Sequence, residues 1–81
     1  MDWDHFRVFL AVARGGQLSA AARRLGVNHT TVARRLDALE AELGSALFER
    51  RPTGCVLTET GARLIPLAER IEIETPAAAA A

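Results

Sequence analysis

The chain has 81 residues, enough for one small domain that can fold alone with a modest hydrophobic core, and this size is compatible with support from a partner subunit. Ten arginines balance ten acidic residues, and this zero net charge gives no support to a nucleic-acid partner. The single cysteine, Cys55, excludes an internal disulfide, and no apolar run is long enough to cross a bilayer, so we expect a cytoplasmic protein without a signal peptide.

Apolar side chains at helical spacing predict a first helix from about Met1 to Arg14 that stops at Gly15 and Gly16. Three of the four aromatic residues of the chain lie on this apolar stripe, so we expect them to pack in the core rather than to stack on a ligand. The stripe consists of Trp3, Phe6, Phe9, Leu10 and Ala13.

Residues 18–44 predict two helices joined by a short turn. Ser19 is a candidate N-cap of the first helix and Asn28 of the second, because both side chains can accept hydrogen bonds from the free amides that open a helix. Gly26 stands where a left-handed residue is expected to end the first of them. Together these signals outline a helix-turn-helix.

The second helix of this pair carries a core stripe at the 3.6-residue period, made of Val32, Leu36, Leu39 and Leu43. Thr30 and Arg34 lie on the opposite face. A helix whose outward face begins with such polar groups, supported by a shorter helix behind it, has the geometry of a major-groove reader. The alternative is an amphipathic core helix with a solvated outer face.

The charges along the chain are unevenly distributed. Residues 1–36 hold six arginines and two acids, whereas residues 37–81 hold four arginines and eight acids, so one end of the molecule is expected to be basic. Within the second helix Arg34 and Arg35 precede three acids, Asp37, Glu40 and Glu42, which is the reverse of the order that the helix dipole favours. We interpret the basic half as the part that meets phosphate and the acidic half as pointing away.

A hairpin is predicted after Gly44, with strands at residues 47–50 and 55–57 and a turn at residues 51–54. A hairpin in this place is a wing, and Arg50 and Arg51 are positioned beside its turn to touch a DNA backbone or minor groove. The alternative is a structural hairpin that covers the core.

Thr58 is the candidate cap of a last helix that runs to about Thr75, with Pro66 predicting a bend inside it. Its apolar stripe is wide, which suggests a second copy of the same helix as partner, while packing wholly within the monomer is the alternative. The candidate dimerisation residues are Leu64, Ile65, Leu67, Ala68 and Ile71.

The predicted fold class is mainly α with a small β-hairpin wing, that is, a winged helix-turn-helix followed by a long linker or dimerisation helix. The domain boundaries expected are 1–58 for the winged helix-turn-helix, 59–75 for the linker helix and 76–81 for a low-complexity tail, which carries no site.

In the order and spacing of its sequence blocks, the chain resembles the N-terminal winged helix-turn-helix domain of LysR-type bacterial transcription regulators over about Asp2 to Ile73. The resemblance is carried by LSAAARRLGV, LDALEAELG, LFER and LTETG, together with the opening helix. It implies a domain that binds double-stranded DNA as a homodimer joined through the final helix. It also implies an effector-sensing domain in the full-length protein.

In the family, the start of the second helix of the motif contacts bases, and the matching positions begin at His29. The candidate DNA-contacting residues are His29, Thr30, Thr31, Ala33, Arg34, Arg35, Ser19, Arg50, Arg51 and Thr53. Chemically, Arg34 can grip guanine O6 and N7 or a phosphate, whereas Ala33 can make only apolar contacts.

The chain departs from the common family pattern at Asn28, where Ser is usual, and at His29, Thr30 and Ala33, where Gln, Pro and Ser are frequent. Cys55 stands where a basic residue is common. Two alternatives stay open: a winged helix used for dimerisation or partner docking, which the zero net charge supports, and the DNA-binding end of another winged-helix regulator family, such as a molybdate-responsive one.

An enzyme is not expected. His5 and His29 lie on different predicted helices without metal-ligand spacing, and Cys55 has no histidine nearby in the sequence. No cofactor, metal or catalytic residue is predicted, and Cys55 is interpreted as an inert strand residue.

Overall fold

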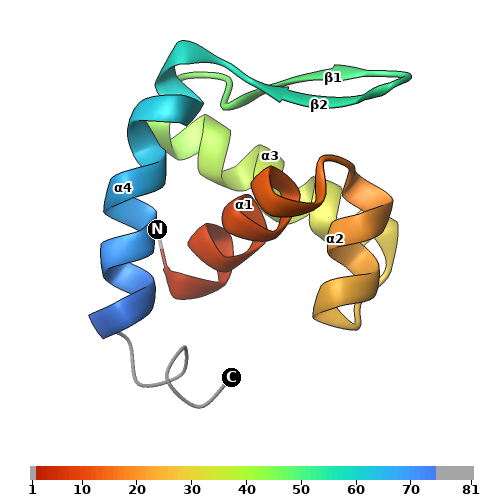
Figure 1. Ribbon diagram of the computed structural model, residues 1–81, viewed down its shortest axis with the longest axis horizontal. Helices are drawn as coiled ribbons and strands as arrows, with labels where there is room; N and C mark the ends of the chain where they lie inside the picture. The colour runs from red at the N-terminus through yellow and green to blue at the C-terminus, as the bar shows by residue number, and fades with distance from the viewer. Residues whose placement is uncertain (1, 75–81) are drawn as a thin grey trace.

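The computed structural model describes residues 2–74, and Figure 1 shows their arrangement. Four helices and one antiparallel hairpin follow in the order α1 (Trp3–Gly15), α2 (Leu18–Leu25), α3 (His29–Leu43), β1 (Phe48–Arg51), β2 (Gly54–Leu57) and α4 (Glu59–Glu74). The helix α1 lies in the middle, with α2 on one side and α4 on the other, and α3 passes behind it from α2 toward α4 (Figure 1). The predicted fold class, a winged helix-turn-helix followed by a long helix, is confirmed.

Within residues 2–74, the helix ends agree with the local signals at every predicted cap or stop except Ser19, and α1 ends at Gly15 as expected. Gly26 adopts the left-handed conformation with φ of 69°. The Asn28 side chain accepts a hydrogen bond of 2.8 Å from the amide of Thr31, and Thr58 Oγ1 accepts one of 3.0 Å from the amide of Gly61. Asn28 and Thr58 therefore cap α3 and α4 as predicted.

The predicted cap at Ser19 is wrong. Gly16, with φ of 78°, ends α1, and Gln17 follows in an extended conformation, so α2 begins at Leu18, one residue earlier than expected. Gln17 occupies the cap position without a side-chain hydrogen bond to the helix. Ser19 lies inside the first turn, where its hydroxyl donates to Gln17 Oε1 at 3.4 Å.

The core is built on α1 and α3. Phe6 and Phe9 are buried and Trp3 is half-buried, which confirms the prediction that this aromatic stripe is core. The stripe of α3 is also confirmed, because Val32, Leu36 and Leu39 are fully buried and Leu43 packs against the core. The rings of Phe9 and Phe48 lie 5.5 Å apart and join α1 to the first strand of the wing.

The hairpin pairs Phe48 with Leu57 and Arg51 with Gly54, so only Pro52 and Thr53 form the turn. The strands thus extend one residue further toward the tip than predicted. Gly54 has φ of 143°, and a Cβ there would lie 2.9 Å from the carbonyl oxygen of Gly16. The same carbonyl accepts a hydrogen bond of 2.7 Å from the Cys55 amide, so the second strand is attached to the end of α1.

The last helix continues through Pro66 without ending. Near its start, Thr58 Oγ1 donates to the Ala46 carbonyl at 2.7 Å, and Gly61 lies so close to the Leu47 carbonyl oxygen that a Cβ would meet it at 2.2 Å. Further along, Ala68 is fully buried against the core. The predicted end of this helix at Thr75 and the tail 76–81 lie outside the described residues. In residues 2–74 no helix is both long and apolar enough to cross a membrane.

Candidate nucleic-acid interface

The start of α2, the start of α3 and the wing turn lie at the same end of the molecule, on the right in Figure 1. Between them is a hollow of about 210 Å³. It is lined by Gln17, Leu18, Ser19, His29, Arg50, Arg51, Pro52, Gly54 and Cys55. The structure therefore brings together four predicted residues that are up to 32 positions apart in the sequence, from Ser19 to Arg51. Gln17 and Cys55 are part of this hollow but were not among the predicted contacts.

The N-terminus of α2 faces this hollow with its amides uncapped by any side chain. The first amides of a helix have no intrahelical acceptor, and the helix dipole makes this end attractive to anions. Because Ser19 does not cap α2, the backbone amides at the start of this helix are free to donate hydrogen bonds to a phosphate oxygen.

The outer face of α3 carries the second group of predicted residues. His29, Thr30 and Arg34 are exposed, and Thr30 and Arg34 are one helical turn apart on the same face. Within residues 2–74, no ion pair engages Arg34, so its guanidinium is available to a ligand. Thr31, Ala33 and Arg35 are half-buried, and the Thr31 hydroxyl donates to Asn28 Oδ1 at 3.0 Å.

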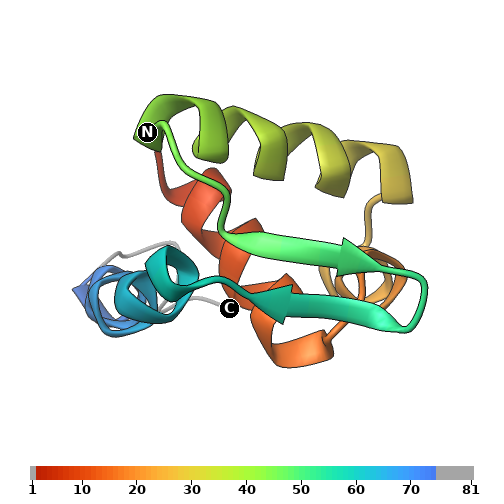
Figure 2. The ribbon, with the colours of Figure 1, turned by 90° about the horizontal axis from the view of Figure 1, so that it is seen from above.

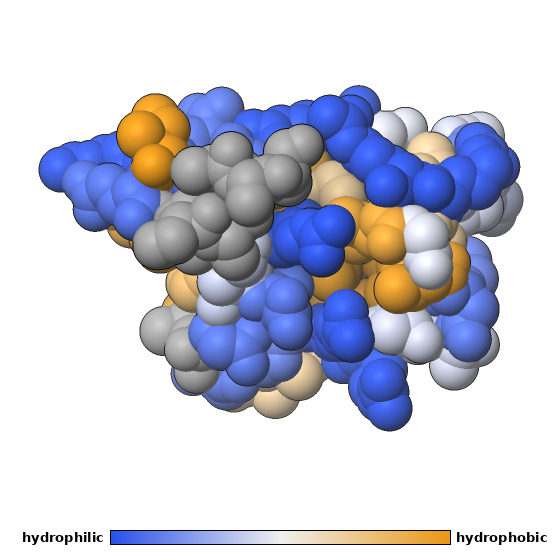
Figure 3. Space-filling model, turned by 90° about the horizontal axis from the view of Figure 1, so that it is seen from below, coloured by the Kyte–Doolittle hydropathy of each residue, from blue (hydrophilic) through white to orange (hydrophobic). Residues whose placement is uncertain are grey.

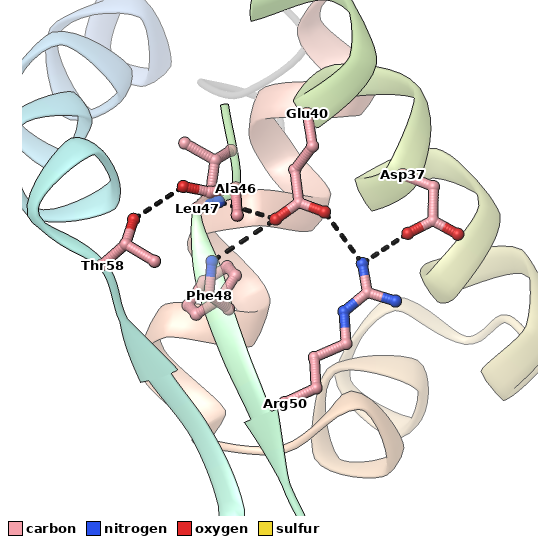
Figure 4. Close-up of polar contacts among 7 residues, drawn as sticks. All are labelled: Asp37, Glu40, Ala46, Leu47, Phe48, Arg50 and Thr58. Atoms are coloured by element: carbon pink, nitrogen blue, oxygen red, sulfur yellow. Dashed lines mark hydrogen bonds and ion pairs between the residues drawn. The ribbon is translucent and has the colours of Figure 1, made fainter. Parts of the chain in front are cut away.

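Arg50 has partners that the sequence did not reveal. Its Nη2 lies 2.5 Å from Asp37 Oδ1 and 3.1 Å from Glu40 Oε1, both on α3 (Figure 4). The other oxygen of Glu40 accepts the amide of Leu47 at 2.6 Å and, at 3.4 Å, that of Phe48. The charge of Arg50 is therefore already balanced, and its predicted contact with DNA stays a prediction.

These contacts correct our interpretation of the charge order in α3. The acids in its C-terminal half do not simply point away, since Asp37 and Glu40 both pair with Arg50 of the wing and Glu42 lies 3.3 Å from His5 Nδ1. Figure 2 shows the hairpin running alongside α3, which is what makes this pairing possible. The acids near the C-terminus of α3 are unfavourable for the helix dipole, but two of them form ion pairs with Arg50 of the wing.

Arg51 is held less firmly than Arg50. Its Nη2 lies 2.9 Å from Glu49 Oε2, and the two side chains are 53% and 61% exposed. An ion pair this exposed contributes about 1 kcal/mol or less, so a phosphate can replace the carboxylate. Thr53 is exposed at the tip of the turn.

Comparison with known proteins places these features in a family. Residues 3–62 match the model of the bacterial regulatory helix-turn-helix proteins of the lysR family. The regulator ClcR of Pseudomonas putida is 41% identical over 71 residues, which cover 88% of this chain and 24% of that protein. The mau operon transcriptional activator of Paracoccus denitrificans is 48% identical over 58 residues, or 65% of this chain and 20% of that protein.

Solved structures show the same similarity. The DNA-binding domain of CbnR in complex with DNA superposes with a TM-score of 0.85 at 41% identity, covering 88% of this chain and 82% of that one. The domain of BenM in complex with a catB site gives a TM-score of 0.84 at 30% identity, covering 88% and 80%.

This chain spans about a quarter of the length of the curated relatives that it matches. The match nevertheless includes every element from α1 to the first turn of α4. By sequence and by fold, the chain belongs to the LysR family of bacterial regulatory helix-turn-helix proteins and forms their winged helix-turn-helix domain.

Proposed function

We propose that this chain binds specific sequences of duplex DNA by placing the N-terminal half of α3 in the major groove. The observation that carries the proposal is the exposed pair of Thr30 and Arg34 at the end of the molecule where α2 and the wing also meet. The major groove is wide enough to admit an α-helix, and the first helix of such a motif crosses the backbone beside it.

Each group of residues has a distinct task in this proposal. Arg34 donates two hydrogen bonds to guanine O6 and N7, while Thr30 offers a hydroxyl or a methyl group to a neighbouring base. His29 and Ala33 border these contacts. The uncapped amides of α2, together with Arg51 and Thr53 at the wing, bind phosphates and fix the position of the helix in the groove.

We further propose that the domain acts as a homodimer joined through α4. A groove of about 420 Å³ lies between α4, the start of α1 and the end of α3, lined by Phe6, Leu43, Leu64, Leu67, Arg70, Ile71 and Glu74. Leu67 is 55% exposed and Ile73 is 77% exposed, although both are apolar. A two-fold axis beside α4 would cover the groove of each protomer with Leu67 and Ile73 of the other.

The predicted dimerisation residues differ in burial, and Leu64, Ile65 and Ile71 all pack partly against the core of their own protomer. Ala68 is fully buried in its own protomer, and Ile65 packs against the core, so both stabilise the position of α4 within the monomer. Leu64, Leu67 and Ile71 line the groove that we assign to the partner. Our proposal adds Phe6 and Leu43, which line the same groove, and the exposed Ile73.

In the full-length protein, we propose that an effector-sensing domain follows α4. The relatives are about four times as long as the matched region, which leaves room for such a domain. The winged helix-turn-helix at 1–58 and the linker helix at 59–75 then act as separate functional parts.

The test is selection of bound duplexes from a random pool by the 81-residue chain, followed by titration of the selected duplexes at low and moderate salt. Enrichment of an interrupted palindrome, with half-sites about one helical turn apart, is the expected result. Binding of all sequences alike would overturn base recognition by α3. A dimer without any DNA binding would favour a protein-interaction module instead.

A further inference from the structure

The last helix is held in place by polar contacts near both of its ends. At its start, Thr58 bonds to the Ala46 carbonyl at 2.7 Å, and Gly61 lies against the Leu47 carbonyl with no room for a side chain. At its far end, Arg14 of α1 makes two hydrogen bonds of 2.8 Å to the two carboxylate oxygens of Glu72. Together with the buried Ala68 between them, these two contacts hold α4 in one direction.

The ion pair between Arg14 and Glu72 has two hydrogen bonds and is therefore stronger than an ion pair with a single one. A guanidinium that meets a carboxylate through two parallel hydrogen bonds is fixed in orientation as well as in distance. The hydrogen bond to Glu72 raises the pKa of Arg14, and the same bond lowers the pKa of Glu72, with the charge of Arg24 lowering it further. Glu69 lies 4.0 Å from Arg14 on the preceding turn.

Apolar packing does not fill the space around this ion pair. A groove of about 400 Å³ separates the end of α4 from α1 and α2, and Trp3, Arg7, Arg14, Arg24 and Glu72 are among the residues that line it. Figure 3 looks from below onto the face where α1 begins and α2 and α4 end, and hydrophilic side chains cover much of it. Arg14 therefore reaches Glu72 along the side of an open groove.

The position of Arg14 also links this contact to the DNA-binding end. Two residues further on, the carbonyl of Gly16 accepts the Cys55 amide of the wing, and Gln17 then leads into α2. The end of α1 is thus attached to the wing and to α4 within three residues.

We propose that the Arg14–Glu72 ion pair is a specificity-determining contact that sets the distance between the two DNA half-sites recognised by the dimer. The inference rests on the proposed dimer through α4. Glu72 lies eleven residues beyond Gly61, or about 16 Å along the helix, so a tilt of about 10° at Gly61 moves it by about 3 Å. In a dimer joined through α4, that displacement is close to the rise of one base pair, about 3.4 Å.

The experiment compares Arg14→Met and Glu72→Gln with Arg63→Met. Arg63 is the matched control, because it also binds a glutamate at 2.8 Å, but its partner, Glu59, is on the same helix. The probes are duplexes that carry two copies of the half-site selected by the wild-type chain, with spacers altered one base pair at a time, and a duplex with a single half-site.

The wild-type chain and Arg63→Met are expected to lose affinity on the order of tenfold when the spacer changes by one base pair, because protein or DNA must deform. Arg14→Met and Glu72→Gln are expected to lose about threefold or less, while their affinity for the single half-site stays unchanged. A purely structural role would instead lower affinity for every duplex together with the melting temperature.

An unchanged spacing profile in both variants, beside a sharp wild-type profile, would overturn this inference and leave the dimer intact. A wild-type chain without any spacing preference would overturn the proposed dimer, and the inference with it. The two failures are therefore distinguishable.

Discussion

The carboxylate of Glu40 joins the wing to α3 by binding Arg50 with one oxygen, at 3.1 Å, and the Leu47 amide with the other, at 2.6 Å. Its side chain is only 17% exposed. The wing turn and the outer face of α3 both belong to the proposed DNA-binding surface. Their relative position thus depends on a residue that touches neither base nor phosphate.

Replacing Glu40 should therefore destabilise the fold. We expect Glu40→Ala to lower the free energy of unfolding by about 1–3 kcal/mol, because the buried Leu47 amide loses its acceptor. Urea denaturation of the two chains measures the difference. Glu49→Ala is the control: its exposed pair with Arg51 should contribute about 1 kcal/mol or less. Equal losses in the two variants would show that the contact at Glu40 does not hold the wing.

Gly61 offers a second test of how α4 is positioned. Gly61→Ala would place a Cβ 2.2 Å from the Leu47 carbonyl oxygen, so the helix or the wing base must shift. We expect a loss of about 2–4 kcal/mol, in the range found for overpacked sites. Gly44→Ala meets no atom within 4 Å and should cost only the strain of its positive φ, about 1–2 kcal/mol. Thermal unfolding of both variants compares them, and a smaller effect at Gly61 would contradict the close contact.

The two arginines of the proposed DNA surface should behave differently. Arg34→Ala is expected to cost about 1–3 kcal/mol of binding and to relax preference at one base position, because it removes a contact with a base edge. Arg51→Ala is expected to weaken binding to all sequences and to reduce the salt slope by about one, because it removes a phosphate contact. Titrations against selected and scrambled duplexes at several salt concentrations separate the two effects.

Arg63→Ala is the control for loss of charge, since Arg63 is exposed on α4 at the other side of the molecule. If Arg34→Ala left both affinity and base preference unchanged, the assignment of α3 as the recognition helix would be wrong.

The dimer surface that we propose on α4 can be tested without disturbing the core. Because the Leu67 side chain is 55% exposed in one protomer, Leu67→Glu should change the stability of the monomer by only about 0.5 kcal/mol. In the proposed dimer it would bury a charged carboxylate against the groove of the partner, and dissociation is expected. Sedimentation velocity gives the mass. Val56→Glu, at an apolar side chain 43% exposed on the wing, should leave the dimer unchanged.

The stability contributed by Glu72 should depend on pH. Its pKa in the folded chain is lowered from the ordinary value of 4.5, chiefly by the hydrogen bond from Arg14, so the ion pair stabilises the fold fully above that pH. The contribution is lost as the pH falls through the folded pKa. We therefore expect Glu72→Gln to be less stable than the wild type by about 1 kcal/mol or less at pH 7, with the difference vanishing in acid. A difference that stays constant with pH would exclude the ion pair as its cause.

Much of this architecture could be predicted from the sequence, because it depends on neighbours within one helical turn. The stripe of Val32, Leu36 and Leu39 follows the helical period, Asn28 caps the helix three residues ahead of the amide it binds, and Gly26 permits a backbone conformation that other residues resist. These local preferences agree with one another. They were enough to predict the helix-turn-helix, the wing and the exposed face at Thr30 and Arg34.

Only the tertiary structure decided the contacts between segments distant in the chain. The pairing of Arg50 with Asp37 and Glu40, and of Arg14 with Glu72, depends on how the wing and α4 lie against the other helices. The start of α2 at Leu18 rather than Ser19 depends on where Gly16 turns the chain. Charge pairing has no period along the sequence, since an arginine can meet any acid that packing brings within reach. The sequence by itself therefore determined the elements and the faces they expose, and packing determined which charges pair with one another across the fold.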